Sequence, residues 1–305
     1  MRIKGELERP ARQPGWWRGT SGVYTPWRMA LFMALTTALV VVLAFTAAML
    51  KLPPHGGGAE TPLFILQNES LLLFAALCAT ALMAWLEGRS FAAAAGLGGA
   101  RRLVRLLQGL ASGVALMGAV LLVLWRGGYV QLTWGGLSAA GIAWYGLIWL
   151  ALTLLIAFTE ELTFRGYVLQ TPLRSGQFWG AAFVTSLIFG GLHFSNNGEG
   201  LIGVADAGLA GFIMAMAIRG TGTLWWAIGF HGGWDYAESF LFGTADSGQR
   251  AVGALLHATP QGAAWVSGGA TGPEGSVFGL GMLTIVGLFA WRGFLRPRRT
   301  AKGYA

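Results

Sequence analysis

The segment "GIAWYGLIWLALTLLIAFTEELTFRGYVLQ", residues 141–170, is long and apolar enough to cross a membrane, yet it contains Glu160, Glu161 and Arg165. About 20 predominantly apolar residues are needed to span the hydrocarbon core of a bilayer as a helix. Ionisable side chains within such a helix are costly, so their presence there indicates a functional site unless they only pair with one another. The meaning of these three charges therefore depends on whether the chain is a membrane protein.

The composition is that of a membrane protein. Of the 305 residues, 54% are hydrophobic and 11% are charged, whereas soluble domains have about 25% charged residues. The 48 glycines and 14 tryptophans agree with this, because glycine is tolerated in membrane helices and tryptophan is enriched at membrane interfaces. The single cysteine, Cys78, excludes a disulfide framework and a cysteine-based metal site. We therefore expect an all-α polytopic membrane protein.

Eight stretches are long and apolar enough to be transmembrane helices, which predicts a single helical bundle. Segments rich in Gly, Pro or charged residues separate them, and the longest of these, residues 243–276, is predicted to be an external loop. The transmembrane domain would cover residues 29–295, between a basic N-terminal arm, residues 1–28, and a basic tail, residues 296–305. The predicted helices lie at about residues 29–50, 64–86, 104–125, 141–170, 178–195, 201–218, 222–242 and 277–295.

The distribution of basic residues predicts the orientation of this bundle. Cytoplasmic segments of membrane proteins are enriched in Lys and Arg. With eight helices and both termini in the cytoplasm, all 21 Lys and Arg residues except Lys51, Arg126 and Arg250 fall in cytoplasmic segments. The net charge of +8 is explained by this topology, so we expect no nucleic-acid partner. The Ala-, Gly- and Arg-rich chain suggests an integral protein of a bacterial inner membrane.

Helix geometry divides the three charges of the first segment into two groups. Glu161 and Arg165 are four residues apart, the better orientation for a carboxylate–guanidinium pair on one helix face. Glu160 is turned by about 100° from Glu161, so it is expected to point elsewhere, into a cavity. The structural alternative is a charged lock that only holds this helix to its neighbours.

Two histidines are predicted at membrane depth on other helices. His231 and Asp235, in "HGGWD", are four residues apart and share one helix face, while His193 ends the predicted helix at 178–195. An aspartate beside a histidine can orient the ring, or both can bind a metal; a buried structural pair is the alternative. Together with Glu160 these groups suit a three-ligand zinc site or a carboxylate–imidazole site that activates water. The helical zinc motif HExxH is absent.

The predicted helix boundaries raise one geometric difficulty. If a helix starts at Phe178, then His193 lies about 22 Å along it by helical rise, nearer the outer side of the membrane than Glu160. A catalytic role for both residues requires them to meet. We therefore expect that helix to start later and be short, or to begin deep in the membrane.

Three motifs in order resemble those of the CPBP family of intramembrane proteases, which includes the type II CAAX prenyl endopeptidase and the bacterial "abortive infection" membrane proteins. "EELTFR" matches E-E-x-x-x-R, "FGGLH" matches F-x-x-x-H, and "HGGWD" matches H-x-x-x-[N/D]. The resemblance covers about residues 141–243; the first three and the last predicted helices match only in being hydrophobic. It implies an endopeptidase that cuts hydrophobic or lipidated peptides, prenylated ones included, within the lipid bilayer.

The resemblance also implies roles for individual residues. Glu160 would activate the attacking water beside His193, Glu161 and Arg165 would support the site, and His231 with Asp235 would bind a metal or stabilise the oxyanion. The implied cofactor is a divalent metal, expected to be zinc, with His193, His231 and Glu160 as candidate ligands; a metal-free glutamate mechanism is the alternative. Many members have Asn where this chain has Asp235, and an ionised aspartate cannot donate to an oxyanion.

Two other functional classes remain as alternatives to the peptidase: a non-catalytic immunity or membrane-binding protein, and a proton or cation transporter. A transporter would show an internal repeat with broken helices in matching halves, which the sequence lacks. A non-catalytic relative is expected to lose at least one motif, and all three are complete here. Asp206, Glu238 and residues 243–276 have no role assigned by the motifs.

Overall fold

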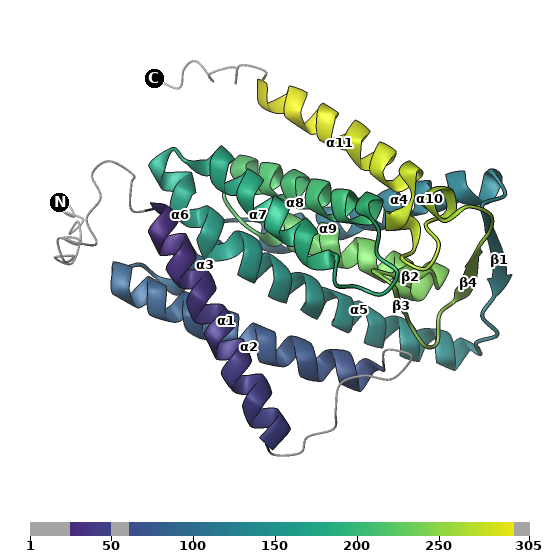
Figure 1. The fold of residues 1–305 in the computed structure, drawn as a ribbon, viewed down its shortest axis with the longest axis horizontal. Coiled ribbons are helices and arrows are strands. Elements are labelled where there is room, and N and C mark those ends of the chain that lie inside the picture. Colours follow the sequence, from purple (N-terminus) through teal and green to yellow (C-terminus); the bar gives the residue numbers. More distant parts are fainter. Residues whose placement is uncertain (1–24, 50–60, 296–305) are drawn as a thin grey trace, which may run out of the picture.

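The computed structural model describes residues 25–49 and 61–295, and these form an all-α membrane bundle (Figure 1). Each of the eight predicted transmembrane segments coincides with a helix. The tail at 296–305 and most of the N-terminal arm, residues 1–24, lie outside the described residues. The elements are α1 (Thr25–Met49), α2 (Pro62–Glu87), α3 (Phe91–Ala95), α4 (Arg102–Arg126), β1 (Val130–Trp134), α5 (Ala139–Glu161), η2 (Leu162–Gly166), α6 (Tyr167–Ser175), α7 (Phe178–His193), α8 (Leu201–Thr221), α9 (Trp225–Tyr236), η3 (Ala237–Phe242), β2 (Ala245–Asp246), β3 (Gln249–Arg250), β4 (Leu256–Pro260), α10 (Ala264–Ser267), η4 (Pro273–Gly275) and α11 (Val277–Leu295).

Among the residues that the structure describes, five helices are long and apolar enough to cross a membrane: α1, α2, α4, the continuous helix from Ala139 to Leu173, and α8. Shorter apolar helices are Phe178–His193 and Val277–Arg292. Large apolar side chains such as Phe45, Trp85 and Phe289 are exposed on their outer surfaces. A water-soluble protein rarely leaves so much apolar surface uncovered, so these faces are the ones that contact lipid.

Local sequence explains where α2 begins and ends. Thr61 caps its N-terminus by accepting a hydrogen bond from the backbone N–H of Phe64, and Pro62 occupies the first helical position. Proline suits that position because it needs no N–H partner there. At the other end, Gly88 adopts a left-handed conformation with φ of 61°, which glycine accepts without steric penalty.

Two helices contain π-helical segments shortly after the residues singled out in the sequence. The helix of α5 continues through the π-helix η2 into α6, and α9 continues into the π-helix η3. Such wide turns often occur at functional sites. Here they follow Glu161 and Asp235 closely, so both motif helices change their winding beside the candidate site.

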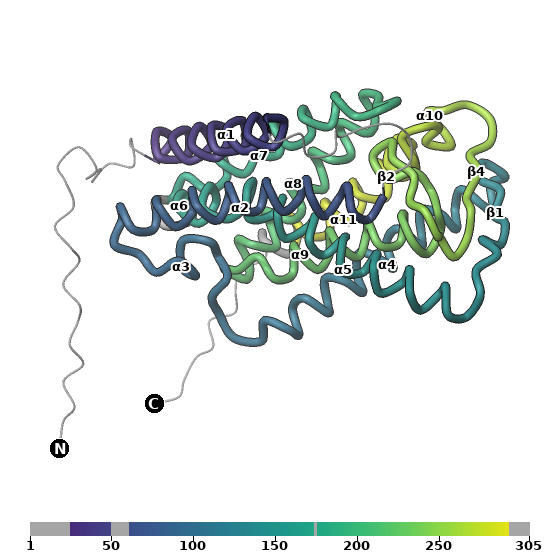
Figure 2. The backbone as a smooth tube through the Cα atoms, turned by 90° about the horizontal axis from the view of Figure 1, so that it is seen from below, coloured from purple at the N-terminus to yellow at the C-terminus, as the bar shows by residue number. Residues whose placement is uncertain are grey.

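Residues 243–276, predicted as an external loop, are ordered and contain three short strands. β4 pairs antiparallel with β1, from Val130 opposite Pro260 to Trp134 opposite Leu256. The indole of Trp149 in α5 donates a hydrogen bond of 2.9 Å to the carbonyl of Val252. Figures 1 and 2 show this segment at the end of the bundle opposite α6. The segment therefore forms a folded cover over one end of the helices.

Helix α9 lies at the centre of the bundle, in contact with α4, α5 and α8. Gly109 and Gly113 of α4 face Gly229 and Gly233 of α9, and a Cβ atom at any of them would overlap backbone atoms of the opposite helix. Small residues spaced four apart let two membrane helices approach this closely. Because His231 is turned by about 200° from Gly229, the glycine contact directs the imidazole away from α4, toward α5.

The glycine contact yields a prediction for Gly233→Ala. The added methyl group would meet the backbone of Leu110, so α4 and α9 must separate, and overpacking of this kind costs about 1–3 kcal/mol. We expect a lower thermal unfolding temperature in detergent. Gly281→Ala in α11 is the matched control, because a Cβ there meets no atom within 4 Å. Equal unfolding temperatures for the two variants would contradict the close helix contact.

Candidate active site

Four of the six sequence-predicted site residues line one cavity of about 420 Å³. They are Glu160 of α5, His193 of α7, and His231 and Asp235 of α9. The other two, Glu161 and Arg165, are fully buried behind it. The three motifs, which are separated along the chain, therefore meet at one place in the fold.

The expected difference in depth between Glu160 and His193 is absent. Helix α7 begins at Phe178, so it does not start later as one of the two expectations had it; instead, α5 continues through η2 and α6 to Ser175, beyond the predicted helix end at residue 170, before the chain turns back. Glu160 and His193 thus lie at nearly equal sequence distances before and after the turn at 176–177. When two helices run antiparallel from a common turn, residues at equal distances from that turn lie at the same level. Glu160 and His193 accordingly line the same cavity.

Glu161 and Arg165 form the buried ion pair expected from their spacing. Arg165 Nη1 lies 2.6 Å from Glu161 Oε1. The guanidinium carbon also lies 4.0 Å from the ring centre of Phe189 in α7, in cation–π contact. Its Nη2 occupies the space beside Gly211 in α8, where a Cβ atom would clash with it. One arginine therefore joins η2, α7 and α8 behind the cavity.

His231 is held by carboxylates on both ring nitrogens. Nδ1 lies 3.1 Å from Glu161 Oε1, the oxygen that also binds Arg165. Nε2 lies 3.7 Å from Glu160 Oε2 and 3.6 Å from Asp235 Oδ2. Because a carboxylate accepts, Nδ1–H donates to Glu161 and Nε2 is the nitrogen presented to the cavity. Glu161 thus links the buried ion pair to the orientation of His231.

The ring of His193 is oriented in the same way, with Nδ1 bonded to a protein acceptor and Nε2 left for the cavity. Its Nδ1 lies 2.8 Å from the backbone carbonyl of Phe189, and because a carbonyl only accepts, this nitrogen carries the proton. In the neutral ring Nε2 is then an acceptor, available to bind a water proton or a metal. The ring of Phe189 contacts the rings of both histidines, with centroid distances of 4.7 Å to His193 and 6.2 Å to His231.

The two adjacent glutamates differ in their access to water. The side chain of Glu160 is 25% exposed, whereas that of Glu161 is fully buried. A carboxylate must reach a water molecule to take its proton, so only Glu160 is placed to act as a general base. Helix geometry predicts that Glu161 pairs with Arg165 while Glu160 points into a cavity, and the structure shows this arrangement.

The candidate zinc ligands do not converge tightly. Among the described residues, one group of at least three His, Cys, Asp or Glu side chains has its ligand atoms all within 4.8 Å of one another, and it consists of Glu238, Asp246 and Glu274. His193, His231 and Glu160 share the cavity without reaching that spacing. As arranged, these three residues therefore do not fit a preformed three-ligand metal site.

Residues from the folded cover complete the cavity, and the motifs gave no sign of them. Asp246, Ser247, Gln249 and Glu274 line it beside the motif residues. Glu199, in the turn between α7 and α8, is close enough for Glu274 to influence it: burial, and then the charge of Glu274, raise the pKa of Glu199. The cavity is therefore acidic toward the end formed by residues 243–276.

Comparison with known proteins agrees with the motifs. The model of the family described as type II CAAX prenyl endopeptidase Rce1-like matches residues 142–237. This range runs from α5 into η3 and contains all six candidate residues, but it is less than half of the chain. A search of curated proteins found no match.

Proposed function

We propose that this chain, which over residues 142–237 belongs to the type II CAAX prenyl endopeptidase Rce1-like family, is an intramembrane endopeptidase that uses Glu160 to activate water. The observation that carries the proposal is the contrast between the two glutamates. Glu160 is partly exposed in the cavity, while Glu161 is buried and engaged by Arg165 and His231. The general base is thus separated from the group that holds the site together.

The chemistry follows from the atoms that face the cavity. A water molecule between Glu160 and His193 would lose a proton to the Glu160 carboxylate while its oxygen attacks the carbonyl carbon of the scissile peptide bond. A protonated His231 would donate from Nε2 to the resulting oxyanion. Glu160 then returns its proton to the leaving nitrogen as the carbon–nitrogen bond breaks, so acid and base are the same carboxylate. Asp235 would orient His231 in this scheme.

A metal requirement, with zinc as the expected ion, stays a proposal for this chain. His193, His231 and Glu160 are the residues that would hold it, and a bound zinc would polarise the carbonyl and lower the pKa of a bound water. Their side chains would first have to move closer together, because their ligand atoms do not meet the 4.8 Å spacing. For that reason the steps above use only protein groups.

A second cavity supports a hydrophobic or lipidated substrate. It has a volume of about 490 Å³, lies between α1, α6 and α7, and is lined mainly by apolar side chains including Met29, Met33, Val184 and Ile188. Phe164 lines both this cavity and the one that holds Glu160. An apolar chain bound here would lie next to the catalytic carboxylate.

Cleavage in liposomes tests this function. The purified protein would be reconstituted and given a farnesylated C-terminal peptide, the same peptide without its lipid, and a hydrophobic peptide, while metal content is measured by mass spectrometry. We expect cleavage, faster for the farnesylated peptide than for its unmodified counterpart. Binding of these peptides without cleavage would favour the non-catalytic alternative, and proton or cation flux without cleavage would favour transport.

A further inference from the structure

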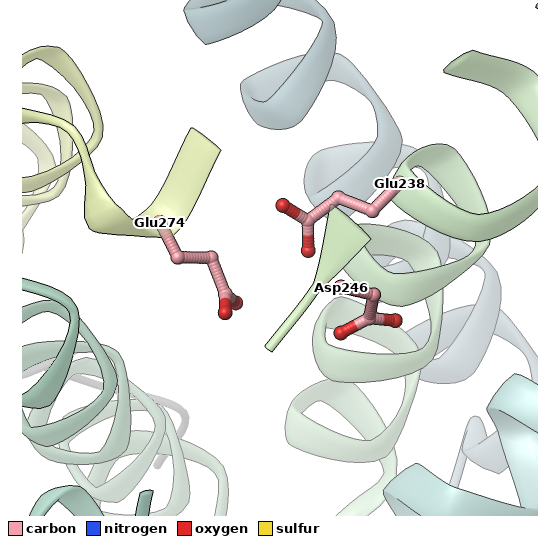
Figure 3. A group of neighbouring side chains, drawn as sticks. All are labelled: Glu238, Asp246 and Glu274. Carbon is pink, nitrogen blue, oxygen red and sulfur yellow. The ribbon is translucent and has the colours of Figure 1, made fainter. Parts of the chain in front are cut away.

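Three carboxylates outside the catalytic motifs meet beside the cavity. Glu238 comes from η3, Asp246 from β2 and Glu274 from η4, and one oxygen of each lies within 4.8 Å of the others. Figure 3 shows Glu274 reaching from one side toward Glu238 and Asp246 on the other. Carboxylates repel one another at such distances, so the grouping needs a compensating positive charge or protons.

Of these three carboxylates, Glu238 is the one whose negative charge most needs to be compensated. Its side chain is fully buried, and neither carboxylate oxygen has a hydrogen-bond partner among the residues the structure describes. An unpartnered buried carboxylate is strongly unfavourable. No described Lys or Arg forms an ion pair with Glu238 or Glu274. The protein itself therefore leaves this buried group unsatisfied.

Neutral donors hold the other two carboxylates in place. Glu274 Oε1 accepts a hydrogen bond of 2.8 Å from the indole of Trp234, and its Oε2 accepts one of 3.0 Å from Ser247. Asp246 Oδ2 accepts one of 3.0 Å from Ser239. Partners of this kind orient metal-binding carboxylates without cancelling their charge. The arrangement is thus preorganised for an additional cation.

We propose that Glu238, Asp246 and Glu274 bind a hard divalent cation, with calcium as the expected ion. All three ligands are oxygens, which calcium and magnesium prefer and soft metals do not. The ligands come from a π-helix, a two-residue strand and a 3-10 turn, and calcium tolerates irregular geometry better than magnesium does. Asp246 and Glu274 also line the main cavity, which provides a path for the ion and for its remaining water ligands.

The bound ion would have a mechanical consequence for the catalytic helix. Glu238 follows Asp235 by less than one turn, while Asp246 and Glu274 belong to the folded cover. The cation would fasten the cover to the end of α9, and the Trp234–Glu274 hydrogen bond would transmit that contact to the residue preceding Asp235. The site is distinct from the catalytic groups and does not depend on the proposed peptidase activity.

Terbium luminescence provides a direct test of binding. Terbium replaces calcium at oxygen sites, and Trp234 donates to a ligand of the proposed site, so it can sensitise a bound terbium ion. We expect luminescence from the detergent-solubilised full chain that calcium displaces more effectively than magnesium. Calcium affinity is expected in the range of about 10⁻⁴–10⁻³ M, as in extracellular calcium modules.

Isosteric variants locate the ion. Glu238→Gln should lower calcium affinity at least about tenfold, as losses of metal-site groups do, and Asp246→Asn is the second variant should Glu238→Gln not fold. Glu160→Gln should bind calcium like the unmodified protein. The opposite pattern, with binding lost in Glu160→Gln and kept in Glu238→Gln, would overturn the proposal by placing the ion among the catalytic residues.

Thermal unfolding gives an independent readout. In chelator, Glu238→Gln should be at least as stable as the unmodified protein, because it removes an uncompensated buried charge. In millimolar calcium at constant ionic strength, the unmodified protein should gain several degrees, since an ion that binds only the folded state stabilises it, and Glu238→Gln should not. The absence of both terbium luminescence and a calcium-dependent shift in the unmodified protein would show instead that protons neutralise the cluster.

Discussion

Glu160→Gln is expected to reduce peptide cleavage at least ~100-fold while leaving the protein folded. Glutamine is nearly isosteric with glutamate but cannot take a proton from water, and general-base catalysis typically contributes about 10²–10⁴-fold. The buried Glu161–Arg165 pair is untouched by this change, so the unfolding temperature should stay close to that of the unmodified protein. The measurement is turnover of the farnesylated peptide in liposomes, with thermal unfolding recorded on the same samples.

Glu69→Gln is the matched control for that experiment. Glu69 of α2 also lines the cavity, so its replacement makes the same chemical change in the same space without touching a motif. We expect its turnover to stay near that of the unmodified protein. Cleavage by Glu160→Gln at the unmodified rate would rule out Glu160 as the general base.

Arg165→Ala is expected to have the largest effect on stability. It leaves Glu161 buried without its ion-pair partner, and breaking such a pair from one side costs about 3–5 kcal/mol. It also removes the contacts with Phe189 and with the backbone beside Gly211. Reduced yield, a lower unfolding temperature and lost cleavage should occur together.

A double variant separates charge from packing at this position. Glu161→Gln combined with Arg165→Ala removes the unpaired charge, so part of the lost stability should return. Cleavage should not return, because Glu161 also orients His231 through Nδ1. An Arg165→Ala protein with unchanged unfolding temperature and full activity would refute the role of the pair.

Hydropathy predicted all eight helices because each lies in an apolar run between polar breaks. It could not predict η2 and η3, since a π-turn differs from an α-turn by its hydrogen-bond register and not by its composition. The strands β1 and β4 were also missed. They pair residues such as Val130 and Pro260 that lie far apart in the sequence, and residues 243–276 show no periodicity from which such pairing can be inferred.

Only those contacts of the site that follow from fixed helical spacing could be predicted from the sequence. The spacing of four residues predicts the Glu161–Arg165 pair and places His231 and Asp235 on one face. It does not show that Glu274 and Asp246 return to the same cavity, because they lie on irregular segments. The contact between α4 and α9 also has a signal in the sequence: Gly109 and Gly113 have the same spacing as Gly229 and Gly233, and matched small residues on two helices indicate a close contact.

The glycine contact between α4 and α9 also bears on how the protein enters the membrane. The described helices that are apolar and long enough to cross a bilayer do not include α9, which carries His231 and Asp235. Its contacts with α4 and α5 hold it in the bundle, and both of those helices precede it in the chain and are synthesised earlier. In the proposed mechanism, His231 and Asp235 would join Glu160 of α5 and His193 of α7 only when α9 docks on helices already in place, so hydrolytic activity would appear late in biogenesis, as a product of assembly.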